Sequence, residues 1–179
     1  ITSNENVTPT NLNYVCYGDA KYVAVGNGGS IITSEDGDSW EEVVSGTVTS
    51  FYSVCYNDGK FIAVGNSGII IASTDGDSWT EATSSGDVTT NKLNSICYGD
   101  GKYVAVGFDG TIITSEDGDT WELSNSGILN NLNSVCYGDN GKYIAVGFAG
   151  LIITSEDGNS WTETVPTSSI TDEDLMDIC

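Results

Sequence analysis

The sequence predicts an all-β fold made of repeated blades, and two observations support this prediction. The first is composition: of 179 residues, 22 are Gly and 2 are Pro. With frequent Val, Ile, Thr and Tyr, this composition favours strands joined by tight turns. The second is a segment, Ser-x-Asp-Gly-x-Ser/Thr-Trp, that is written four times at intervals of about 40 residues. Such a period is typical of propellers and solenoids. We call the four copies, residues 34–40, 73–79, 115–121 and 155–161, the acidic turns.

Each repeat is predicted to contain four strands, as the third copy illustrates. Residues 93–98 form the first strand, and the Gly-Asp-Gly-Lys sequence at 99–102 suits a tight hairpin turn. Residues 103–107 are mostly apolar, which indicates a second strand buried on both faces. Residues 111–115 form the third strand, and Trp121 opens the fourth after the acidic turn. Four antiparallel strands in a unit of about 40 residues make one blade of a β-propeller.

Both ends of the chain are predicted to be partial blades. Residues 1–3 copy the Ile-Thr-Ser at 113–115 and at 153–155, and residues 175–179 match 132–136. The predicted boundaries are 1–11 for the tail of a partial blade, 12–50, 51–92, 93–131 and 132–170 for four complete blades, and 171–179 for the first strand of a further blade. The ring could close through a composite fifth blade made of 171–179 and 1–10, through further blades beyond the chain ends, through pairing with another chain, or as a ring of four.

The acidic turns have the chemistry of structural turns. A carboxylate can accept hydrogen bonds from the following backbone N–H groups, Gly can adopt positive φ, and Trp can pack between blades. The residues expected to do this are Asp36, Gly37 and Trp40; Asp75, Gly76 and Trp79; Asp117, Gly118 and Trp121; and Asp157, Gly158 and Trp161.

This segment resembles the Asp-box, or bacterial neuraminidase repeat (BNR), which lies between the third and fourth strands of propeller blades. The segment here is one residue shorter than the usual form. The strand pattern before it resembles repeats of bacterial surface and phage-associated propellers. The resemblance implies the propeller fold and a location that is extracellular, on a cell surface or on a virion.

Most catalytic chemistry is excluded by composition. The chain has no His, so it cannot form a Ser-His, Cys-His or His-metal site. Among Asp-box propellers, sialidases use an arginine triad and the photosystem assembly factors present an arginine patch, whereas this chain has no Arg. A two-carboxylate glycoside hydrolase is a distant alternative. Its catalytic acids should depart from the repeat, and the acids that do so are Asp109, Glu81 and connector residues such as Asp87. We therefore predict that the protein is not an enzyme.

Charge and cysteines limit the partners. The formal net charge of -21 repels nucleic acid and anionic membrane surfaces, and no apolar run is long enough to insert into a membrane. The charge is interpreted first as a solubility device, and second as a surface that attracts divalent cations or basic partners. Cys16, Cys55, Cys97, Cys136 and Cys179 are copies of one strand position. We expect free thiols, no metal and no cofactor; a site of four cysteine ligands on the propeller axis is the alternative.

The copies of the repeat differ mainly at one end of the predicted propeller. Because strands alternate in direction, the turns between second and third strands share an end with the connectors between blades. The residues that vary there, and that we predict to bind a ligand, are Asn27, Asn66, Phe108, Asp109 and Phe148. Phe108 and Phe148 could equally pack over a neighbouring blade. The predicted function is recognition or adhesion through binding of a glycan or protein surface. The alternative is a structural repeat segment of a longer fibre or multidomain surface protein.

Overall fold

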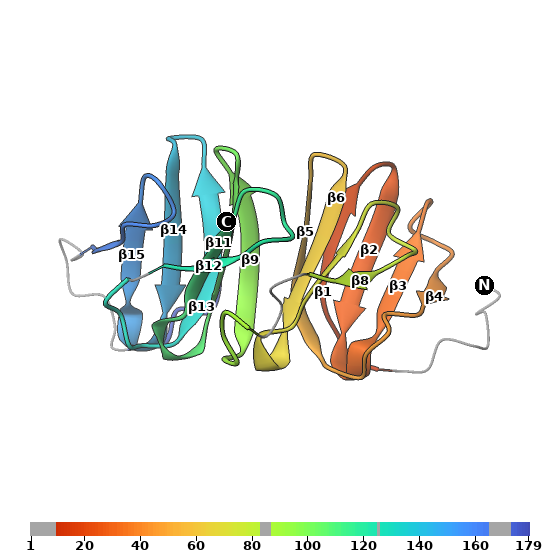
Figure 1. The fold of residues 1–179 in the computed structure, drawn as a ribbon, viewed down its shortest axis with the longest axis horizontal. Helices are drawn as coiled ribbons and strands as arrows, with labels where there is room; N and C mark the ends of the chain where they lie inside the picture. The colour runs from red at the N-terminus through yellow and green to blue at the C-terminus, as the bar shows by residue number, and fades with distance from the viewer. Residues whose placement is uncertain (1–9, 83–86, 125, 165–172) are drawn as a thin grey trace.

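In the computed structural model, which describes residues 10–82, 87–124, 126–164 and 173–179, the chain forms four sheets that follow one another in space in chain order (Figure 1). We number these sheets as blades 1 to 4. Blade 1 contains β1 (Leu12–Gly18), β2 (Lys21–Gly26), β3 (Ile31–Ser34) and β4 (Glu41–Val43), and blade 2 contains β5 (Phe51–Asn57), β6 (Lys60–Gly65), β7 (Ile70–Ser73) and β8 (Thr80–Glu81). Blade 3 contains β9 (Leu93–Gly99), β10 (Lys102–Gly107), β11 (Ile112–Ser115) and β12 (Glu122–Leu123), and blade 4 contains β13 (Leu132–Gly138), β14 (Lys142–Gly147), β15 (Ile152–Ser155) and β16 (Thr162–Glu163).

Within each blade, sequential strands are hydrogen-bonded neighbours and all pairs are antiparallel. Short 3-10 turns join the second and third strands: η1 (Asn27–Gly29), η2 (Asn66–Gly68), η3 (Phe108–Gly110) and η4 (Phe148–Gly150). The predicted all-β propeller fold with four-stranded antiparallel blades is therefore confirmed. The exact blade boundaries stay a prediction, and the partial blade predicted at 1–11 lies almost wholly outside the described residues.

Within the residues that the structure describes, the core consists of three apolar layers, one between each pair of adjacent blades. Between blades 1 and 2, Val23 and Val25 of β2 pack with Phe51 and Val54 of β5. The layers between blades 2 and 3 and between blades 3 and 4 use the equivalent positions. Each blade therefore places its second and third strands against the first strand of the next blade.

The first strands of neighbouring blades also approach closely. Ser53 Oγ of β5 accepts a hydrogen bond from Ile96 N of β9 at 3.3 Å. Ser95 Oγ of β9 accepts one from Val135 N of β13 at the same distance. Gly18 is required at this approach, since a Cβ there would lie 2.0 Å from the ring of Tyr56 in the next blade.

The C-terminal residues continue this arrangement beside blade 4. Leu175 N donates to Gly147 O at 3.0 Å, and Asn133 Nδ2 of β13 donates to Leu175 O at 2.8 Å. Asn13 and Asn94 make the equivalent bonds to the first residues of β5 and β13. Residues 175–179 thus lie where the first strand of a next blade would lie, although no strand is assigned to them.

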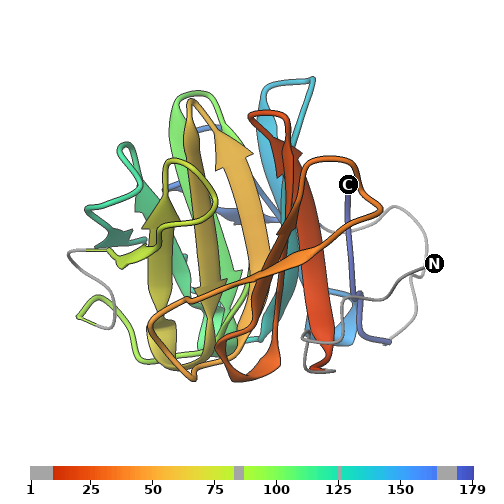
Figure 2. The same cartoon turned by 90° about the vertical axis from the view of Figure 1, so that its right-hand side faces the viewer.

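The first strand of blade 1 is more exposed than the first strands of the other blades. The side chains of Leu12, Tyr14, Val15 and Tyr17 on β1 reach solvent. Figure 2 turns the side of the molecule that carries blade 1, in red and orange, toward the viewer. No helix in the described part of the chain is long and apolar enough to span a membrane.

Candidate binding face

The turns sort onto two ends of the molecule, as the sequence predicts. We call the first end the turn face; it holds the turns between first and second strands together with the acidic turns. Lys21 Nζ, at the start of β2 directly after a turn between first and second strands, lies 2.5 Å from Asp77 Oδ2 in the acidic turn of the next blade. Lys60 Nζ lies 2.8 Å from Asp119 Oδ2 in the same way.

The opposite end, which we call the loop face, holds η1–η4 and the connectors between blades. Gly28 N of η1 donates to Ser50 Oγ at 3.1 Å, and Asp109 N of η3 donates to Asn131 Oδ1 at 2.9 Å. Both acceptors end the connector that leads into the next blade. The loop face is therefore built from segments that neighbouring blades hold in place.

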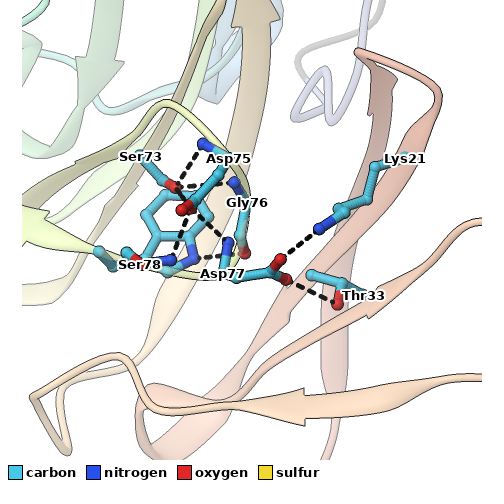
Figure 3. Close-up of polar contacts among 8 residues, drawn as sticks. Lys21, Thr33, Ser73, Asp75, Gly76, Asp77 and Ser78 are labelled. Atoms are coloured by element: carbon cyan, nitrogen blue, oxygen red, sulfur yellow. Dashed lines mark hydrogen bonds and ion pairs between the residues drawn. The ribbon is translucent and has the colours of Figure 1, made fainter.

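Each acidic turn is closed by its own side chains, as Figure 3 shows for blade 2. Asp75 Oδ1 accepts hydrogen bonds from the backbone N–H groups of Asp77 at 2.8 Å and Ser78 at 2.7 Å. Ser73 Oγ donates to the same carboxylate oxygen at 3.0 Å and accepts from Gly76 N at 2.8 Å. Gly76 has φ of 77°, a conformation that favours glycine.

The electrostatics of these turns follow from the same hydrogen bonds. Backbone N–H groups stabilise the charged carboxylate, which lowers the pKa of Asp36 and Asp75 and brings the pKa of Asp117 and Asp157 to about 2. The Trp121 indole donates to Gly118 O at 3.2 Å, and its ring packs against the core. These groups are satisfied within the scaffold, which suits a structural role.

Lys21, Lys60 and Lys102 on the turn face each link their blade to the next one, and the last of these links differs from the others. Lys21 pairs with the carboxylate of Asp77 (Figure 3). At the junction of blades 3 and 4, Asn159 takes the place of that aspartate, and Lys102 Nζ donates to the backbone oxygen of Asp157 at 3.0 Å. Polar recesses of about 310 Å³ open beside both junctions. Their linings come from equivalent positions of the repeat, with Asn159 in one recess where Asp77 stands in the other.

The predicted ligand-binding residues all lie on the loop face. Asn27, Asn66, Phe108 and Phe148 are the first residues of the four 3-10 turns, and Asp109 follows Phe108 with φ of 53°. The side chains of Phe108 and Phe148 are 39% and 41% exposed. Asn27 Oδ1 accepts a hydrogen bond from Asn13 Nδ2 at 3.0 Å. The two rings are thus only partly covered by neighbouring residues.

Phe108 belongs to a cluster that the residue-by-residue prediction missed. Lys92 Nζ lies 3.7 Å from the ring centroid of Tyr52 and 5.2 Å from that of Phe108. Lys92 is half-buried, and this desolvation lowers the pKa of its ammonium group. A hollow of about 410 Å³ has Asn91 and Asp109, the chain neighbours of Lys92 and Phe108, in its wall. The hollow therefore lies next to the cluster, although the three cluster side chains do not line it.

The alternative chemical sites receive no support from their surroundings. Glu81, Asp87 and Asp109, the acids that depart from the repeat, are all exposed, whereas a glycosidase needs one carboxyl in an environment that keeps it protonated. Cys16, Cys55, Cys97, Cys136 and Cys179 are free thiols, and burial raises the pKa of Cys16 and Cys97 to about 12. Across the described ranges, no three Cys, Asp or Glu side chains form a group that could hold a metal ion.

The family of the chain is decided by a sequence model. The model of the DUF6242 beta propeller domain matches residues 54–175, about two thirds of the chain. The chain belongs to this family. No curated protein matches the chain in sequence.

Solved structures similar to this DUF6242 domain are also propellers. YCF48 bound to a D1 peptide has a TM-score of 0.70 and 20% identity, over 91% of this chain and 56% of that one. Virginiamycin B lyase from Staphylococcus aureus has a TM-score of 0.74 and 15% identity, over 88% and 57%. The WD40 propeller domain of Doa1 has a TM-score of 0.66 and 16% identity, over 93% and 57%. At these identities the likeness shows the fold, and this chain spans less than two thirds of each of these proteins.

Tyr52 and Lys92 could have been found by aligning the repeats with one another. Asn13, Asn94 and Asn133 occupy the strand position at which blade 2 has Tyr52. Ser50, Asn131 and Asp174 occupy the position at which Lys92 stands. The signal was therefore present as two departures from the repeat, 40 residues apart in the chain.

Proposed function

We propose that this DUF6242 domain is a non-enzymatic recognition module that binds a segment of a partner protein through its loop face. The observation that carries the proposal is the placement of the differences between repeats: the turn face copies one set of residues, while the loop face carries Phe108, Phe148 and the Tyr52–Lys92 pair. Variable residues on a rigid scaffold are a usual way to build a binding site. The acidic turns act in this proposal as Asp-box turns that hold the scaffold.

The chemistry of the loop face supports a partner that offers apolar side chains. Two partly exposed rings can act as anchors, since aromatic residues are enriched at the energetic centres of protein interfaces. The hollow beside Phe108 is lined in part by Val88, Ile128 and Leu129, which can receive an aliphatic group. A propeller of similar fold was solved with a peptide bound, which is consistent with this class of partner.

The setting that we propose, a cell surface or virion, follows from the resemblance to surface and phage-associated repeats. One observation favours a second candidate function, a structural segment of a longer fibre or multidomain surface protein. The uncovered side chains of β1 in blade 1 are the kind of surface that a further blade would cover.

The proposal is tested by selecting peptides from a random display library on the immobilised chain. Selected peptides should lose roughly 10-fold or more in affinity when Phe108 and Phe148 are both replaced by Ala, because each ring is an anchor. Asp38→Asn, a change on the turn face, is the matched control and should leave binding unchanged. The urea midpoint of each variant checks that it remains folded.

Two results would contradict the proposal. One is a selection that enriches no peptide, particularly if an array of bacterial and plant glycans gives binding that depends on Phe108. The other is a set of peptides that bind the double variant as tightly as the original chain. Ordered end-to-end assembly without ligand binding would favour the structural segment instead.

A further inference from the structure

We propose that Lys92, held between the rings of Tyr52 and Phe108, is a binding site for a carboxylate of the partner segment, an Asp or Glu side chain flanked by apolar residues. This inference rests on the proposed function and names the chemistry that the loop face recognises.

The first support is that the junction of blades 2 and 3 departs from the repeat at two positions that touch. At the other junctions, Asn13, Asn94 and Asn133 each donate a hydrogen bond to the first-strand residue of the next blade, at 2.7 to 2.8 Å. Blade 2 has Tyr52 at this position, which lacks the amide. The asparagine hydrogen bond that links the blades at the other junctions therefore cannot form between blades 2 and 3.

The second position is the residue directly before the first strand of a blade, which is Lys92 in blade 3. Ser50, Asn131 and Asp174 each accept a hydrogen bond from the backbone N–H at the centre of the preceding blade's 3-10 turn. Lys92 stands at the equivalent position before β9, and an ammonium group cannot accept such a bond. Neither Tyr52 nor Lys92 can therefore make the hydrogen bond that the equivalent residues make within the scaffold. Their two side chains contact each other on the loop face instead.

The third support is the state of the ammonium group. Among the described residues, the ion pairs of Lys21, Lys60 and Lys142 use carboxylates, and Lys102 has a backbone oxygen. The ammonium group of Lys92 instead lies over the faces of two aromatic rings, those of Tyr52 and Phe108. Ring faces attract a cation but offer weaker acceptors than a carboxylate, and an ammonium group has three N–H donors to place. A half-buried cation of this kind gains from an external carboxylate.

The surroundings define the ligand further. Phe108 and the neighbouring hollow offer an apolar surface for the residues beside the carboxylate. The net charge of -21 repels strongly acidic segments at long range. The preferred ligand is accordingly a neutral or basic segment with one acidic residue, rather than a polyanion.

The experiment uses peptides selected on the intact chain for binding that depends on Phe108, resynthesised with both ends blocked so that no terminal charge contributes. In each peptide, the acidic residue is changed to its amide. We expect the change from Glu to Gln, or from Asp to Asn, to weaken binding to the original chain by about 10-fold or more. On a Lys92→Met variant, which keeps an unbranched side chain over Tyr52, acid and amide peptides should bind equally.

Lys102→Met is the matched control, since Lys102 lies on the turn face, and it should preserve the preference for the acid. The inference is overturned if the selected peptides share no acidic residue, or if the acid and its amide still differ on Lys92→Met. In both cases peptides that depend on Phe108 still exist, so the proposed function stands. A selection without any such peptide overturns both.

Discussion

Blade 1 and the three blades that follow carry the same side-chain pattern and bury it to different extents. On β1, Leu12 and Val15 are 47% and 53% exposed. Their equivalents on β5, Phe51 and Val54, are 0% and 1% exposed. The equivalents of Leu12 on β9 and β13, Leu93 and Leu132, are fully buried as well.

The apolar side chains of a first strand are therefore buried by contact with the preceding blade, and not by contacts within their own blade. Each first strand is covered by the second and third strands of the blade before it, as Val23 and Val25 cover Phe51. Among the described residues, β1 lacks such a cover. The stability of a repeat array is approximately a sum of terms for each unit and each junction, so equal residues contribute unequally along the chain.

The largest expected effect is the contrast between Leu132→Ala and Leu12→Ala. Leu132 is fully enclosed between blades 3 and 4, so its truncation removes apolar contacts and leaves a cavity. We expect the free energy of unfolding to fall by about 2–5 kcal/mol. Leu12→Ala should lower it by less than about 1 kcal/mol, because this side chain is already half exposed. Urea unfolding followed by tryptophan fluorescence measures both.

Equal losses for the two leucine variants would break the comparison. They would mean that another part of the chain covers β1 in solution as fully as blade 3 covers β13.

An intermediate effect should come from the acidic turns, which are closed by local hydrogen bonds in every blade. The folded-state pKa of Asp117 is about 2, below the ordinary value of about 3.9 for an aspartate. Its charged form therefore stabilises the fold above about pH 4, and this contribution is lost as the pH falls to about 2. The pKa of Asp36 in blade 1 is lowered by the same contacts.

We accordingly expect Asp117→Asn and Asp36→Asn to lower the urea midpoint at pH 7 by similar amounts, each well below the effect of Leu132→Ala. The difference from the original chain should shrink between about pH 4 and pH 2. Urea midpoints at several pH values give both quantities. If the two variants lowered the urea midpoint by different amounts, the stability of an acidic turn would depend on the neighbouring blade. Blade 1 would then differ from the other blades in its turns as well as in its apolar burial.

The smallest effect concerns the lysine links between blades. Asn159→Asp would place a carboxylate near Lys102, as Asp77 lies near Lys21. An exposed ion pair of this kind adds about 0.2–1 kcal/mol and weakens with salt. Differential scanning calorimetry at low and high salt measures the change. The same substitution in a Lys102→Met background is the control, and a gain there would show that the pair is not responsible.

The fold was predictable because four copies of one unit reinforce each other. A single strand such as 103–107 is ambiguous, but its recurrence at a fixed distance before Trp121 and its copies leaves a four-stranded blade as the consistent assignment. The separation of turn face and loop face followed from strand alternation alone. Phe108 could thus be placed on the loop face from the sequence.

The contact of Lys92 with Tyr52 could not be predicted in the same way. Tyr52 lies on the first strand of blade 2, where alternation gives its side of the sheet but not its neighbours. Lys92 ends a connector whose path no repeat pattern specifies, because the connectors differ in length. The distance between the two side chains depends on how blade 3 packs against blade 2, and that packing is a tertiary property.

The exposed first strand also has a colloidal consequence. Copies that each carry a formal charge of -21 repel one another over a Debye length of about 30 Å at 10 mM salt. At 1 M salt that range shrinks to about 3 Å, and the uncovered side chains of Leu12, Val15 and Tyr17 can meet the apolar surface of another copy. The second virial coefficient of the protein should therefore change sign with ionic strength, because the net charge keeps the exposed β1 strands of separate copies apart at low salt.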